Sequence, residues 1–269
     1  MKKILLLFLF LSIQTFAQII ISPYIILVNE NYRFGKFIVQ NESNQTYEVT
    51  ISFLFGFPQS DSLGTTSMKY IDNPDSTYPS AVKWIKAFPR KFFLEPGQRQ
   101  LIRMLVNPGS ELPAGTYWAR IVTSSAPTSV AADTVRQGIS AKIKFVLNQI
   151  TTLLYRTGDI ETKAELKNYF VKEDTGGTSV YVELERNGNS PFFGDAVVSV
   201  SNDSGRVVSE KTEGLSLYYN LSKKFYFENL KPGNYSAEIK IIHNEKEVIP
   251  ESTIKPDEPI IRRLQFTVN

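Results

Sequence analysis

The sequence of 269 residues contains no cysteine and only one histidine, His243. Without thiols the chain can form neither disulfides nor zinc–thiolate sites, and it has no cysteine nucleophile. A single histidine cannot build a multi-histidine metal site. Because His243 lies between an apolar run and the charged segment 244–246, we expect it to be solvated rather than catalytic.

Other signatures of catalysis are also missing. No phosphate-binding glycine loop of either common pattern occurs. Acidic residues lie in turn-like segments without the spacing of a calcium loop, so turn chemistry explains them. We therefore expect no metal, no cofactor and no enzymatic activity.

Long apolar runs are scarce, and the longest one opens the chain. Lys2 and Lys3 precede the almost wholly apolar residues 4–13, and the small residues Thr15 and Ala17 follow at the positions that a signal peptidase reads. This order is typical of a signal peptide, residues 1–17, cleaved after Ala17. The run is shorter than the roughly 20 residues that span a bilayer, so we expect an exported chain with no transmembrane segment. Losing both lysines leaves it nearly neutral, which argues against nucleic acid as a partner.

The first half of the chain has short apolar runs separated by clusters of Asn, Gly, Pro and Ser. They cover 24–28, 37–39, 47–55, 82–88, 101–106, 117–122 and 139–147. About seven short strands is the number typical of an immunoglobulin-like sandwich. Residues 60–80 are rich in Ser, Asp, Thr and Pro and are expected to form a long exposed excursion.

The second half repeats this style from about Ser179 onward, after a break at 155–159. Residues 161–169 fit a strand, a loop or a short helix. Phe192-Phe193 and Tyr218-Tyr219 are adjacent pairs, so one member of each should point outward toward a partner if the backbone is extended. The pattern predicts an all-β chain of two immunoglobulin-like β-sandwich domains in tandem, 18–150 and 151–269.

Two segments resemble a known family. Residues 93–106 read FLEPGQRQLIRMLV, and a proline-containing turn and the aromatic strand 117–122 follow. This run resembles the first domain of the PapD-like periplasmic chaperones of pilus assembly. Residues 185–195, ERNGNSPFFGD, resemble the segment that opens the second domain in atypical, non-classical members.

The resemblance implies a client-binding site in residues 134–147. In the family, the corresponding edge strand lends alternate apolar side chains to an incomplete pilin fold, a form of β-augmentation. The matching positions here are Val135, Ile139, Ala141 and Ile143. Lys144 matches a lysine that binds the client's terminal carboxylate, although a solvated lysine explains it equally well.

The sequence departs from the family at two places. Tyr24 or Ile25 stands where classical members carry an arginine, and Gln137 interrupts the apolar row.

The resemblance implies a periplasmic assembly chaperone whose partners are secreted, pilus-like subunits. It leaves open whether an outer-membrane usher takes part. The alternative is a structural or adhesive module of the envelope or cell surface built from the same two sandwiches.

Overall fold

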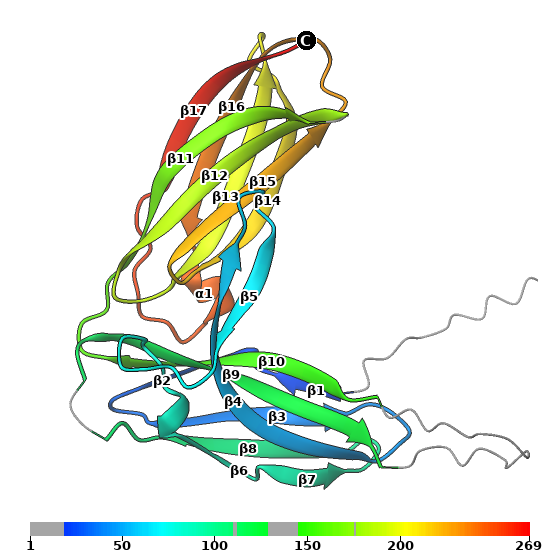
Figure 1. Cartoon of the computed structure of the whole chain (residues 1–269), viewed down its shortest axis with the longest axis vertical. Coiled ribbons are helices and arrows are strands. Elements are labelled where there is room, and N and C mark those ends of the chain that lie inside the picture. Colours follow the sequence, from blue (N-terminus) through cyan, green and yellow to red (C-terminus); the bar gives the residue numbers. More distant parts are fainter. Residues whose placement is uncertain (1–18, 110–111, 129–144, 175) are drawn as a thin grey trace, which may run out of the picture.

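The computed structural model describes residues 19–109, 112–128, 145–174 and 176–269, and Figure 1 shows their arrangement. Nearly all of the regular structure is β-strand, in two bodies set at an angle to each other. The expected signal peptide, 1–17, lies outside the described residues. Within them, no helix is long and apolar enough to cross a membrane.

The first sandwich packs two sheets against each other. One has the order β1-β3-β8-β6, and its strands are β1 (Ile19–Ser22), β3 (Phe34–Asn41), β8 (Arg99–Val106) and β6 (Ile85–Phe88). The other has the order β2-β10-β9-β4-β5, with β7 also paired to β4. Its strands are β2 (Ile25–Asn29), β10 (Leu147–Thr157), β9 (Gly115–Pro127), β4 (Tyr47–Ser60), β5 (Thr66–Ile71) and β7 (Lys91–Leu94).

Strict alternation builds the core of this sandwich. In β8, Ile102, Met104 and Val106 are buried, while Arg99 and Arg103 face solvent. Side chains two apart share one face of a strand, so one sheet supplies both a core layer and an outer surface. The turn before β8, expected from Pro96-Gly97, is present, and Gly97 has φ +73°, which glycine adopts without strain.

The amino-terminal strand divides between both sheets. β1 pairs antiparallel with β3, and β2 pairs parallel with β10. The pairing of β2 covers only Thr152–Arg156 of β10. The other edge of β10 pairs with β9 along its whole length, from Leu147 to Thr157.

The second sandwich has the sheet orders β11-β12-β15 and β14-β13-β16-β17. Its strands are β11 (Thr162–Asp174), β12 (Gly177–Gly188), β13 (Phe192–Asn202), β14 (Val207–Leu217), β15 (Asn220–Glu228), β16 (Gly233–His243) and β17 (Ile260–Val268). A single helical turn, α1 (Glu245–Val248), follows β16. Residues 162–174 are therefore strand, and this sandwich starts before Ser179.

The prediction of an all-β chain with two sandwiches is confirmed. The change from one pair of sheets to the other falls at residues 158–161, between β10 and β11. The division expected at residue 150 lies inside β10, because pairing with β9 continues to Thr157.

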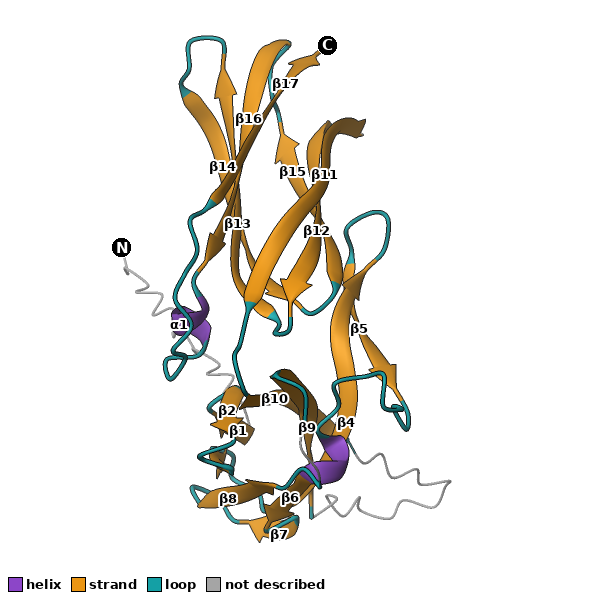
Figure 2. Cartoon of the chain, turned by 90° about the vertical axis from the view of Figure 1, so that its left-hand side faces the viewer, coloured by secondary structure: helices purple, strands orange, loops and turns teal. Residues whose placement is uncertain are grey.

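The segment 60–80 is largely exposed, as expected, but part of it is regular strand. It contains β5, which pairs with the end of β4 from Phe55–Ile71 to Ser60–Thr66 and forms a long hairpin. Figure 2 shows this hairpin rising beside the second sandwich. The rings of Phe57 and Tyr219 lie 4.6 Å apart, and the Ser222 amide donates to Ser60 Oγ at 2.6 Å. The hairpin thus extends the first sandwich onto β15.

Candidate functional site

The residues expected to bind a client, Val135, Ile139, Ala141, Ile143 and Lys144, lie outside the described residues. The structure describes the chain again from Phe145, and the strand β10 begins at Leu147. The segment expected to form a strand, 134–147, therefore directly precedes β10 in the sequence and shares Leu147 with it. The strand edge described next begins at Leu147, which is the last residue of the expected client-binding segment.

β10 has an open edge over its first five residues. Its pairing with β2 starts at Thr152, and among the described strands none pairs with that edge from Leu147 to Thr151. The Gln149 side chain donates to the Ile19 carbonyl at 3.1 Å, which ties this edge to β1 only through a side chain. Unpaired backbone groups on such an edge can receive another strand.

Apolar side chains are exposed along the same segment. The exposed fractions are 78% for Phe145, 56% for Val146, 45% for Leu147 and 43% for Ile150. Exposed large apolar groups next to an open strand edge favour protein binding over solvation.

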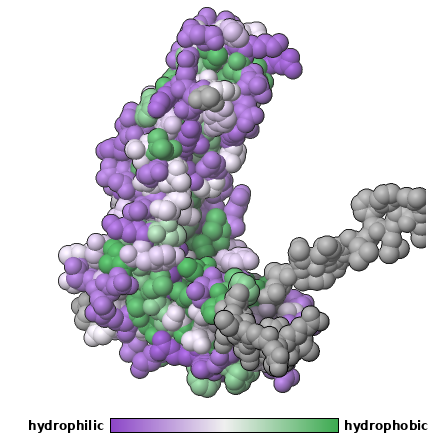
Figure 3. Space-filling model, turned by 45° about the vertical axis from the view of Figure 1, so that its right-hand side comes forward, coloured by the Kyte–Doolittle hydropathy of each residue, from purple (hydrophilic) through white to green (hydrophobic). Residues whose placement is uncertain are grey.

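The surface beside this edge continues to the junction of the sandwiches, where Figure 3 shows apolar residues gathered. A buried cluster joins the two bodies at this junction. It comprises Phe55, Phe57, Trp118, Leu154, Phe193, Tyr218 and Ile249. Trp118 lies at its centre, with ring distances of 5.2 Å to Phe55 and 4.8 Å to Tyr218.

This cluster corrects the expectation for the two aromatic pairs. Phe192 faces the core of the second sandwich, whereas Phe193 joins the junction cluster, and both are buried. Tyr218 is 1% exposed in the junction, and Tyr219 packs on Phe57. Phe193 of the first pair and both tyrosines of the second pair leave their own core, but the partner they meet is the first sandwich.

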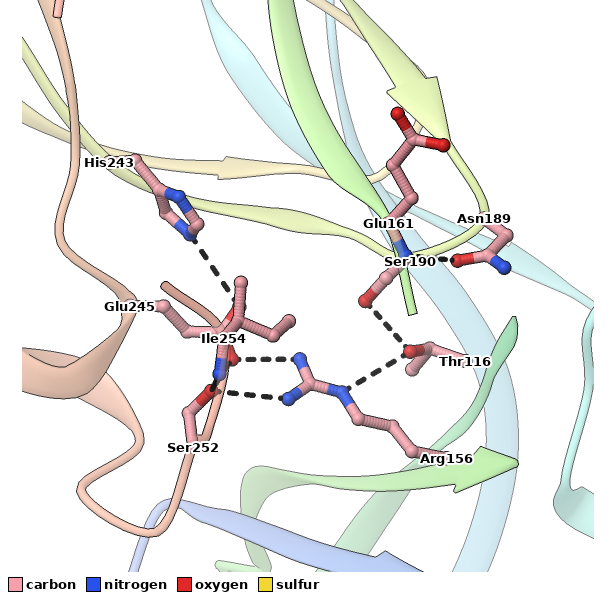
Figure 4. A network of polar contacts seen from close by, with 9 residues as sticks. All are labelled: Thr116, Arg156, Glu161, Asn189, Ser190, His243, Glu245, Ser252 and Ile254. Carbon is pink, nitrogen blue, oxygen red and sulfur yellow. Dashed lines mark hydrogen bonds and ion pairs between the residues drawn. The ribbon is translucent and has the colours of Figure 1, made fainter. Parts of the chain in front are cut away.

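A buried ion pair also joins the sandwiches (Figure 4). Arg156, in β10, contacts Glu245 of α1 at 2.8 Å, and it donates to Ser252 Oγ at 3.3 Å and to Thr116 Oγ1 at 3.4 Å. Thr116 in turn donates to Ser190 Oγ at 2.7 Å. An arginine at the end of the apolar run 153–155 signals a buried partner, but the sequence does not identify Glu245.

His243 is buried, not solvated as expected. It is 5% exposed, and its ring packs 5.0 Å from Phe192. Its Nε2 atom lies 3.9 Å from a Glu245 oxygen, beyond hydrogen-bond range, and neither ring nitrogen has a hydrogen-bond partner. Phe192 of β13 and Glu245 of α1 lie against the imidazole and account for its burial.

A second buried arginine, Arg120, extends from β9 near the junction. Its Nε donates to the Gly56 carbonyl at 3.0 Å, and its guanidinium also donates to Thr152 Oγ1. It lies 4.8 Å from the centre of the Tyr218 ring, and burial raises the pKa of that phenol. Arg120 is therefore held by structural contacts. Tyr24, which with Ile25 is one of the two residues expected where the family carries an arginine, is 69% exposed, and its carbonyl accepts from the Thr152 amide.

The chain is similar in fold to solved structures of chaperones. A search of solved structures returned CsuC–CsuE, a chaperone–tip adhesion subunit complex of Acinetobacter baumannii, at 15% identity and TM-score 0.46, covering 91% of this chain and 98% of that one. It also returned the YadV chaperone, at 10% identity and TM-score 0.48, covering 93% and 100%. The Pseudomonas aeruginosa CupB2 chaperone matches at 11% identity and TM-score 0.45, also covering 93% and 100%. No family model and no curated protein matches the sequence.

Proposed function

We propose that this protein is a non-enzymatic assembly chaperone of the periplasm that binds secreted β-rich subunits by lending them an edge strand. The observation that carries the proposal is the open edge of β10 at Leu147–Thr151, next to exposed apolar side chains. The sequence motifs at 93–122 and 185–195 support it independently. Pilin-like subunits, whose incomplete fold accepts such a strand in the family that the sequence resembles, are the proposed clients.

The binding mode follows from the backbone. A client strand added to the open edge gains main-chain hydrogen bonds, and alternate side chains supply specificity. The proposal assigns Val135, Ile139, Ala141 and Ile143, which precede β10 in the sequence and lie outside the described residues, to the donated strand. The client in turn loses an exposed edge that would otherwise aggregate.

Lys144 is the proposed anchor for a client carboxylate. A charge-assisted hydrogen bond in a partly desolvated cleft contributes roughly 1.5 to 3 kcal/mol. The position adjoins Phe145, so the anchor and the edge would act on one bound strand. Arg120, a second cation near the junction, already donates to Gly56 and Thr152, so it is assigned a structural role and not a second anchor.

The test begins by identifying clients. The tagged protein is isolated from periplasmic extract, captured subunits are identified by mass spectrometry, and one of them is co-expressed with the wild type and with Ile150→Asp. The variant should lose most of the bound subunit, because a charge replaces an apolar contact at the edge. Val208→Asp is the matched control: Val208 is also an exposed strand residue, at 45%, but it lies on β14 of the second sandwich.

A second comparison tests the anchor. Lys144→Ala should weaken subunit binding by about one to two decades without unfolding the chain. If Ile150→Asp, Ile139→Asp and Lys144→Ala all bind the subunit as the wild type does, strand donation is wrong. Retention of the protein on the cell surface without any client would instead support the envelope module.

The export proposal has its own check. Amino-terminal sequencing of the periplasmic protein should give Gln18 as the first residue. A chain that retains Met1 in the membrane fraction would contradict cleavage after Ala17.

A further inference from the structure

The outer face of the sheet β1-β3-β8-β6 is unlike the rest of the surface. It lies on the side of the first sandwich turned away from the second sandwich (Figure 2). Alternation directs its outward residues into four rows across the strands. They are Phe34, Leu105 and Lys86; Lys36, Arg103 and Phe88; Ser22, Ile38 and Leu101; and Ile20, Gln40 and Arg99.

The charges on this face have one sign. Lys36, Lys86, Arg99 and Arg103 are all exposed, and none forms an ion pair with any described residue. Lys36 and Arg103 are directly opposed across β3 and β8. Like charges in that position repel. The outward rows contain no acidic side chain, so the face is complementary to an anionic partner.

Large apolar side chains are exposed between these cations. Phe34 is 76% and Phe88 75% exposed, and Ile20, Ile38 and Leu101 are exposed at 37–40%. Beside Lys36, a groove of about 390 Å³ opens where the chain passes from β1 to β2. Its lining is mainly apolar and includes Ile25, Leu27 and Phe34, with Glu251 from the second sandwich as its one carboxylate.

These features exclude a second copy of the same face as the occupant, because four cations would meet four cations. A face that only contacts water would not account for the exposure of the Phe34 and Phe88 rings, which lie beside the charges and not in a core. Cations interspersed with exposed aromatic and aliphatic groups match the interface of an anionic bilayer, where basic groups meet headgroups and apolar side chains enter the acyl boundary.

We propose that this sheet face docks on an anionic lipid surface. The four cations contact headgroups, Phe34 and Phe88 insert at the boundary, and the groove beside Lys36 accepts part of an acyl chain. The open edge of β10 belongs to the other sheet, so it stays available while the outer face is occupied. The inference goes beyond strand donation and does not depend on it.

Co-sedimentation of the processed chain with vesicles tests the proposal. Vesicles of phosphatidylcholine with phosphatidylglycerol should bind the protein, and pure phosphatidylcholine vesicles should bind it much less. Binding should fall as salt screens the charges. The double variant Lys36→Gln/Arg103→Gln should bind about thirtyfold more weakly, since each basic residue near such a surface contributes about 1 kcal/mol.

A matched control separates this face from overall charge. Arg206→Gln/Lys255→Gln removes the same charge at exposed positions of the second sandwich and should bind like the wild type. Phe34→Ser/Phe88→Ser should weaken binding while keeping its salt dependence. Circular dichroism verifies the fold of each variant.

Three results would overturn the proposal. They are equal loss in both charge variants, equal binding to both vesicle types, and no vesicle binding by a protein that does bind soluble heparin. The last would indicate a soluble polyanionic partner in place of a membrane. A client-binding defect in Ile150→Asp with unchanged vesicle binding would show that the two surfaces act separately.

Discussion

Arg156 and Glu245 form an ion pair between the two sandwiches at 2.8 Å, with side chains only 8% and 1% exposed. One partner lies in β10, which also carries the open edge, and the other in α1. The strand proposed to bind the client is therefore fixed at its far end to the second sandwich. The conditions that preserve this pair should preserve the geometry of the client site.

Breaking the pair should be costly. Arg156→Met leaves the Glu245 carboxylate buried without its cation and should lower the free energy of unfolding by about 3–5 kcal/mol. Arg156→Met/Glu245→Met should recover most of the loss, because no buried charge remains. Urea unfolding measures both. Lys167→Ala, which removes exposed ion pairs with Glu165 and Glu185, should leave the stability nearly unchanged; an equally small effect of Arg156→Met would contradict the interpretation.

The contact of the β4–β5 hairpin with β15 can be tested by two glycines of similar backbone conformation. Gly64 has φ +78° and Gly97 has φ +73°. A Cβ on Gly64 would lie 2.8 Å from the backbone nitrogen of Lys224, whereas no heavy atom lies within 4 Å of a Cβ on Gly97. Both alanine variants should lose about 1 kcal/mol or more from the left-handed backbone.

Only Gly64→Ala should also displace the hairpin from the second sandwich. Hydrogen exchange of β4–β5 and limited proteolysis at 60–66 should then increase in Gly64→Ala and not in Gly97→Ala. Equal protection in both variants would mean that the hairpin gains no order from β15.

The buried His243 should be replaceable by an apolar ring. Both of its nitrogens lack hydrogen-bond partners, and unsatisfied buried polar groups cost roughly 1–3 kcal/mol. His243→Phe keeps a ring beside Phe192 and should leave the stability unchanged or raise it, as measured by thermal unfolding. A loss above about 1 kcal/mol would show that the 3.9 Å approach to Glu245 stabilises the fold.

Asp174 should make stability depend on pH at the acid end. Hydrogen bonds from Lys224 and Ser179 lower the pKa of this carboxyl below its ordinary 3.8. Its contribution is therefore fully present above pH 3.8 and is lost as the pH falls through the lower value of the folded chain. Asp174→Asn should flatten the fall in melting temperature below that pH. Asp203→Asn, in the exposed β13–β14 turn, serves as control, and an equal flattening there would refute the assignment to Asp174.

Local patterns were sufficient for the fold because strands and turns depend on near neighbours. The Pro96-Gly97 turn and the alternation of β8 follow directly from the residues at 96–106. Contacts between residues far apart in the sequence could not be predicted from these patterns. His243 is buried because Phe192 of β13 and Glu245 of α1 lie against it, and Phe193 is covered because another sandwich lies beside it.

The candidate site was only partly predictable for a related reason. Apolar alternation over 134–147 marks a segment able to form a strand, but it does not say where pairing with β9 and β2 starts. The open edge at Leu147–Thr151 results from β2 joining β10 late, at Thr152. The register of β2 on β10 depends on where the amino-terminal segment crosses from one sheet, as β1, to the other, as β2. No local sequence pattern predicts that point.

The long strand β4 has a mechanical consequence. Its first part pairs with β9 inside the first sandwich, and its end, from Phe55 to Ser60, pairs with β5 and contacts the second sandwich. A torque applied to the second sandwich therefore reaches the first sandwich through this hairpin as well as through the connection at 158–161. Twisting the two bodies apart would have to break the contacts of this hairpin with β15, including the hydrogen bond from the Ser222 amide to Ser60 Oγ, so the hairpin resists rotation about the connection at 158–161.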